Sequence, residues 1–91
     1  MSRSVYKFTV EDPAGSIIKA PGLGRALMFG TQLDEWVVWC EVDLDGPMRA
    51  REFAVFGTGH PLPHEDEGWT HVNSWQHPPF VWHGYVRSAV A

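Results

Sequence analysis

The stretch ALMFGTQLDEWVVWCEVD, residues 26–43, decides the fold. Two runs with apolar residues at alternate positions, residues 26–32 and 36–43, flank the polar tip Leu33-Asp34-Glu35. Such alternation is typical of β-strands, and a short polar tip between two alternating runs predicts a hairpin. Both faces of the second run carry apolar side chains near its middle. We therefore expect it to be a central strand covered on both sides.

The same period of two continues through the rest of the chain. Further strands are expected at residues 5–10, 16–19, 51–57, 69–76 and 80–86. Gly- and Pro-rich turns separate them, and residues 58–68 are expected to form an irregular loop. No segment of about ten residues combines a helical period with end caps, so no long helix is expected. About seven short strands predict an all-β fold, either a compact β-sandwich or a small, partly open barrel, with residues 1–91 as a single domain.

The chain is short but rich in aromatic residues. Its 91 residues include five Trp, five Phe and two Tyr, and each such ring can bury about 150–250 Å². These rings can fill a small core, and they can also form an adhesive face. Because a chain of this length has a thin core, we expect a homo-oligomer.

Charge and segment patterns argue against several classes of partner. The formal net charge is −4 and the seven Lys and Arg residues are scattered, so nonspecific nucleic-acid binding is not expected. No long apolar stretch or signal-peptide pattern is found, so we expect no membrane partner and a cytoplasmic location. The single cysteine, Cys40, lies in the middle of an apolar run. This position predicts a buried, unreactive thiol.

The run Gly57-Thr58-Gly59-His60-Pro61 is the strongest candidate for a binding site. The two glycines allow positive φ angles, and successive N–H groups in such a turn can form an anion-binding nest. Thr58 adds a hydroxyl group and His60 adds an imidazole. The alternative is a rigid turn at the end of a strand, in which both side chains bond the local backbone. The spacing fits neither a P-loop nor a dinucleotide-binding motif.

The last two expected strands offer a second candidate. Strict alternation puts Trp75 on one face with His71 and Asn73, while Gln76 ends that strand and His83 lies on the next. A mixture of indole, imidazole and amide groups is typical of a stacking pocket for a planar ligand, or of an interface hot spot. The alternative is a Trp-rich core. We take Trp75, Gln76 and His83, together with the turn residues, as the candidate ligand-binding set.

Metal binding and catalysis are not expected. The five histidines are spread over residues 60–83, and their spacing does not by itself assemble the three or four ligands that zinc requires. The acidic run Glu65-Asp66-Glu67 is interpreted as a solvated loop, and no serine lies in a nucleophile elbow. The sequence therefore predicts no cofactor, no metal site and no catalytic residue.

Several motifs together resemble an uncharacterised family of small bacteriophage and prophage proteins. They are the Gly57-Thr58-Gly59-His60-Pro61 turn after a strand, a short strand ending in Gln76, and the closing strand Phe80-Val81-Trp82-His83. The His77-Pro78-Pro79 turn departs from the Gly-rich or aliphatic turn of the relatives. The resemblance implies a phage origin, a small accessory protein and a location in the cytoplasm of the infected bacterial host. It implies no activity.

These observations lead to the hypothesis of a non-enzymatic phage protein that sequesters a small anionic, nucleotide-derived ligand or signal and so counters host defence. The glycine-rich turn would hold a phosphate while Trp75 stacks on a base. Two alternatives remain open: an inhibitor that binds a host protein through an aromatic patch, and a minor structural or assembly component of the virion. A ligand binder needs polar groups around a cavity, whereas an inhibitor needs an exposed apolar patch.

Overall fold

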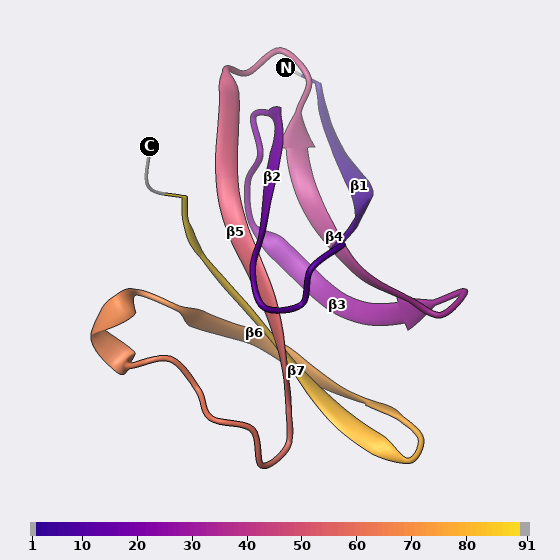
Figure 1. The fold of residues 1–91 in the computed structure, drawn as a ribbon. Coiled ribbons are helices and arrows are strands. Elements are labelled where there is room, and N and C mark those ends of the chain that lie inside the picture. The colour runs from indigo at the N-terminus through magenta and orange to yellow at the C-terminus, as the bar shows by residue number, and fades with distance from the viewer. Residues whose placement is uncertain (1, 90–91) are drawn as a thin grey trace.

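The computed structural model describes residues 2–89 and shows an all-β chain (Figure 1). The strands are β1 (Arg3–Thr9), β2 (Ser16–Pro21), β3 (Ala26–Gln32), β4 (Glu35–Asp43), β5 (Met48–Gly57), β6 (Thr70–His77) and β7 (Phe80–Ser88). A single turn of 3-10 helix, η1 (Glu65–Glu67), is the one helical element in this part of the chain. The predicted all-β fold without a long helix is confirmed. None of the described residues belongs to a helix that is long and apolar enough to cross a membrane.

Two strands begin two or more residues earlier than the side-chain alternation predicts. β5 begins at Met48 instead of residue 51, and β1 begins at Arg3 instead of residue 5. In both cases the extension pairs with a neighbouring strand, since Met48 lies opposite Pro21 and Arg3 lies opposite Asp43. Backbone pairing, which does not depend on alternation, therefore sets these ends.

The strands form two antiparallel sheets that pack as a sandwich. The three-stranded sheet has the order β1-β4-β3, and the four-stranded sheet has the order β2-β5-β7-β6. β4 is the central strand of its sheet, as predicted. The buried core residues come from both sheets and from the segments before and after β2, and they include Val10, Leu23, Phe29, Val38, Cys40, Val42, Phe53 and Val55.

The core is tightest where Phe29 meets the backbone of β7 at Gly84. A Cβ atom at Gly84 would collide with the ring of Phe29. The same ring lies 6.0 Å from that of Phe53 and stacks on Trp75, at 6.1 Å with an interplanar angle of 11°. The absence of a side chain at Gly84 therefore lets a phenyl ring fill the space between the sheets.

Asn73 joins the two sheets at the edge of β3. Its Oδ1 accepts a hydrogen bond from the N–H of Phe29 at 2.6 Å, and its Nδ2 donates to the carbonyl oxygen of Phe29 at 3.1 Å. The side-chain amide thus takes the position of a peptide group in a neighbouring strand. Beside it, Nε1 of Trp75 donates to Oγ1 of Thr31 at 3.0 Å.

β1 differs from the other strands because nearly all of it is exposed. Val5 is 56% exposed and Tyr6 is 43% exposed, although β1 pairs with β4 along its full length. β1 is the outer strand of the three-stranded sheet and lies away from β5 and β7 (Figure 1). On its inward face Ser4 and Tyr6 are exposed while Phe8 packs against the core, so the second sheet covers only the Phe8 end of β1.

Candidate functional site

The predicted turn directly follows β5, and its backbone donors are used within the chain. The N–H of Gly57 donates to Nδ1 of His60 at 3.3 Å. The N–H of Thr58 donates to the carbonyl oxygen of Val81 at 3.1 Å, and the N–H of His60 donates to that of Gly57 at 3.1 Å. The N–H groups of Gly57, Thr58 and His60 are therefore engaged within the chain, which argues against a nest of successive free donors at this turn. The geometry is that of the alternative, a rigid turn whose side chains bond the local backbone.

The same turn nevertheless forms one wall of an open pocket, which we call the turn pocket. It has a volume of about 440 Å³ and is lined by Gly57, Thr58, His60, Pro79, Phe80, Val81 and Trp82. The ring of Trp82 lies 6.4 Å from that of His60 and 5.6 Å from that of Phe80, at interplanar angles of 63° and 55°. Phe80 is 59% exposed. The pocket is therefore mainly apolar and contains three rings.

Gly57 permits this arrangement of rings. A Cβ atom at that position would lie 2.8 Å from the His60 ring and 2.9 Å from the Trp82 ring, which is closer than real contacts allow. Gly59 has a φ of +88°, a conformation that glycine adopts readily. The two glycines of the motif therefore have separate roles, one in packing and one in turning the chain.

His83 lies on the opposite face of β7 from Trp82 and joins the turn to the outer face of the four-stranded sheet. Its Nε2 lies 2.8 Å from Oγ1 of Thr58, whose proton is donated to the carbonyl oxygen of Val81 at 3.2 Å. The hydroxyl can instead donate over the shorter contact to Nε2 of His83; when it donates to Val81, Nε2 is the donor. In the neutral ring Nδ1 is then an acceptor, and Oγ of Ser74 lies 2.6 Å from it.

A directional hydrogen-bond chain follows from these assignments. Oγ of Ser74 also lies 2.9 Å from Nε2 of His71. With the Thr58 proton on Val81, donation runs from His71 to Ser74, then to His83, Thr58 and finally the carbonyl of Val81; with the other His83 tautomer, donation between His71 and Thr58 runs the opposite way. We did not predict this chain from the sequence, because strict alternation puts residues 71 and 74 on opposite faces. A β-bulge between His71 and Asn73 brings them to the same face.

Because of the bulge, Trp75 does not share a face with His71, although strict alternation predicts that it does. His71 lies on the outer face, whereas Trp75 points into the core, stacks on Phe29 and meets Trp36 edge-on at 6.2 Å. Trp75 is thus part of a Trp-rich core, which was the alternative interpretation, and it does not line the turn pocket. Gln76 is exposed opposite Val81, outside the turn pocket. The rings beside the turn are instead those of Phe80 and Trp82.

In the part of the chain that the structure describes, the Cys40 thiol and the remaining histidine side chains do not form a further site. Cys40 is fully buried, and burial raises the pKa of its thiol from 9.0 to about 12, with a smaller opposing effect from the positive charge of Arg51. His60 and His64 are close in sequence, but His64 pairs with Asp66 at 2.7 Å. Within residues 2–89, no three His, Cys, Asp or Glu side chains are grouped so that they could hold a metal ion.

One comparison with known proteins gives a match. The family model described as a domain of unknown function, DUF7352, matches residues 1–91. The chain belongs to this family. No curated protein and no solved structure matches the chain. The description of the DUF7352 family names no activity.

Proposed function

We propose that this DUF7352 protein is a non-enzymatic binding protein that takes the planar ring of a small, nucleotide-like ligand into the turn pocket. The observation that carries the proposal is the grouping of the His60, Phe80 and Trp82 rings around a volume of about 440 Å³. Small-molecule sites have volumes of roughly 300–1,000 Å³ and are lined mainly by apolar and aromatic side chains with a few polar groups.

The polar group that would orient the ligand is the imidazole of His60. Its Nδ1 accepts the N–H of Gly57, so in the neutral ring Nε2 carries the proton and is a donor. This donor would meet an acceptor or an anionic part of the ligand. A planar ring would contact Phe80, whose exposed face has room for stacking. Binding would therefore depend on ring stacking and one hydrogen bond, without a phosphate nest.

The biological setting of this proposal rests on the resemblance to small phage proteins. Such a protein would act in the cytoplasm of an infected bacterium, where sequestering a nucleotide-derived signal would counter a host defence. A binder of this type needs no catalytic group. It acts by mass action, so its cellular effect would depend on its abundance relative to the ligand.

The proposal is tested by titrating the protein with adenosine, guanosine, cytidine and uridine and with their 5′-monophosphates, while the indole N–H signals are followed by NMR. We expect the Trp82 signal to shift and saturate with at least one of these compounds. Phe80→Ala should weaken that binding by roughly tenfold, which corresponds to the loss of one stacking contact. Met48→Ala is the matched control, because it removes another exposed apolar side chain at the far end of β5.

Two results would contradict the proposal. One is a Trp82 signal that does not respond to any of the eight compounds. The other is equal affinity of the Phe80→Ala and Met48→Ala proteins for the compound that binds.

A separate observation favours a second function, inhibition of a host protein. The free edge of β1 carries exposed apolar side chains at Val5 and Tyr6. An extended segment of another protein can pair with such an edge through its backbone, while alternate side chains contribute specificity. The expected homo-oligomer would use the same edge. The mass of the purified protein alone in solution therefore separates the two functions: a multiple of the chain mass indicates self-association, and a monomer leaves the edge free for a host protein.

A further inference from the structure

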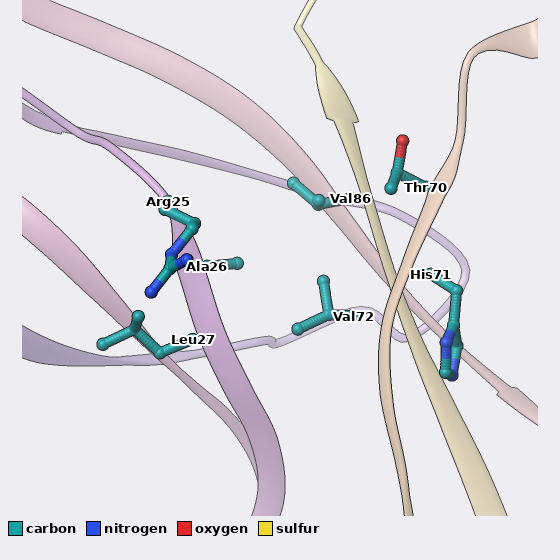
Figure 2. Close-up of a pocket in the computed structure, with 7 residues that line it drawn as sticks. All are labelled: Arg25, Ala26, Leu27, Thr70, His71, Val72 and Val86. Atoms are coloured by element: carbon teal, nitrogen blue, oxygen red, sulfur yellow. The ribbon is translucent and has the colours of Figure 1, made fainter.

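A second pocket lies where the edge strands β3 and β6 diverge, far along β6 from the turn pocket. We call it the edge pocket; its volume is about 420 Å³. Figure 2 shows its two walls, formed by Arg25, Ala26 and Leu27 on one side and by Thr70, His71 and Val72 on the other. It shares no lining residue with the turn pocket.

Both walls carry a β-bulge at this position. The register of β3 shifts between Ala26 and Met28, and the register of β6 shifts between His71 and Asn73. The residues inside the two shifts, Leu27 and Val72, both line the edge pocket. Bulges redirect side chains and are over-represented beside functional sites. Here two bulges, on strands of different sheets, flank the same space.

The floor of the edge pocket is apolar. The side chains of Ala26 and Val72 point toward each other across the gap, and Val86, which is almost fully buried, lies between the walls (Figure 2). Through its two bonds to Phe29, Asn73 ties β6 to β3 directly after Val72, one of the residues that line the pocket.

One residue that lines the pocket, Arg25, is a cation, and its guanidinium group lies on the Leu27 side of Ala26, away from Val72 and Val86 (Figure 2). Arg25 is exposed, and no ion pair involves it among residues 2–89, whereas Arg3 pairs with Glu41 at 3.1 Å and Arg87 pairs with Glu52 at 2.8 Å. A free guanidinium group is well suited to a carboxylate or phosphate, because it can donate two parallel hydrogen bonds. The exposed hydroxyl of Thr70 is a further polar group of the pocket lining.

We infer that the edge pocket binds a small amphipathic anion, a carboxylate or phosphate that carries a short aliphatic chain. The chain packs against Ala26, Val72 and Val86, and the exposed side chain of Arg25 turns toward the pocket to pair with the anionic group. This ligand differs in chemistry from the planar ring proposed for the turn pocket. The two sites are therefore tested independently.

The experiment is an NMR titration of the full chain with hexanoate, hexanol and acetate, which present both parts of the ligand, the chain alone and the anion alone. Hexanoate is expected to shift the backbone amides of Leu27 and Val72 in a saturable manner and to leave the Trp82 indole signal unchanged. Hexanol and acetate should bind roughly tenfold or more weakly. Arg25→Gln should weaken hexanoate binding by roughly tenfold and leave hexanol binding unchanged, since only the charged contact is lost.

Arg49→Gln is the matched control, because Arg49 is also exposed and lines neither pocket. It should bind hexanoate as the unmodified protein does. The inference is overturned if hexanoate causes no saturable shift at Leu27 and Val72, or if acetate alone reproduces it. It is also overturned if Arg25→Gln and Arg49→Gln have the same effect, since the attraction would then come from overall charge.

Discussion

Strands β4 and β1 are paired neighbours in one sheet, yet they have opposite environments. On the face toward the four-stranded sheet, Val38, Cys40 and Val42 of β4 are each 1% exposed or less, whereas Tyr6 of β1, which lies opposite Cys40, is 43% exposed. The four-stranded sheet covers β4 and β3 but leaves β1 largely open. The comparison shows that alternation identifies which residues share a face of a strand. It does not show whether another layer covers that face.

The largest effect is expected where the covered region is tightest. Gly84→Ala puts a methyl group into the ring of Phe29, so either the ring or the β7 backbone has to move. We expect the free energy of unfolding to fall by about 3 kcal/mol or more, at the upper end for an overpacked core. Urea denaturation measures this loss.

A double variant sharpens this result. Phe29→Ala is destabilising by itself, by about 3–5 kcal/mol. In the Gly84→Ala background it should cost clearly less, because the clash is removed together with the ring. Additive losses in the double variant would show that Gly84 and Phe29 do not interact as described.

An intermediate effect is expected from Cys40 at alkaline pH. Burial raises the pKa of its thiol in the folded protein to about 12, above its ordinary value of 9.0, so between these values the unfolded state releases the proton and the folded state retains it. The stabilising contribution is complete below pH 9 and is lost as pH rises toward 12, by about 1.4 kcal/mol for each pH unit. Cys40→Ala should lack this component when unfolding free energies of the two proteins are compared across that range.

Lysine and tyrosine titrations affect both proteins equally, so the difference between the two curves isolates Cys40. Parallel curves would mean that the thiol is not protected by the core. Rapid reaction of the folded protein with a thiol reagent at pH 8 would lead to the same conclusion.

The smallest effect on stability is expected in β1. Val5→Thr keeps the shape and β-propensity of an exposed side chain, so the free energy of unfolding of the dilute protein should change by no more than about 0.5 kcal/mol. If β1 joins a second copy of the chain, the same substitution should weaken that association, as measured by sedimentation equilibrium at micromolar concentration. A loss of more than about 1 kcal/mol in dilute protein would show that β1 is covered in solution.

Much of the fold follows from the sequence because strand alternation is local. The hairpin at residues 26–43 and the seven strands could be predicted, since each depends on residues a few positions apart. The bulge between His71 and Asn73 could not be, because it is defined by pairing with β7. That one extra residue moves His71 away from the face of Trp75 and into the hydrogen-bond chain with Ser74 and His83.

The candidate turn illustrates the same limit. Its residue types predict a turn rich in hydrogen-bond donors, which is what the structure contains. The N–H groups of Gly57 and His60 bond within the turn, but the donors of Thr58 are engaged by the carbonyl of Val81, which lies more than twenty residues later and meets Thr58 through strand pairing. The ring pocket around the turn likewise depends on Phe80 and Trp82, which β7 brings beside Gly57.

The amide of Asn73 has a consequence for the growth of larger assemblies. By bonding both backbone groups of Phe29, it fills the part of the β3 edge on which an added strand would start. The three-stranded sheet then has one free side, at β1, and two copies that pair through β1 would use up the free side of each. The joined sheet would have β3 as its outer strand on each side, with its edge bonded to the Asn73 amide. Assembly through this sheet would therefore stop at two chains and could not continue into a fibre.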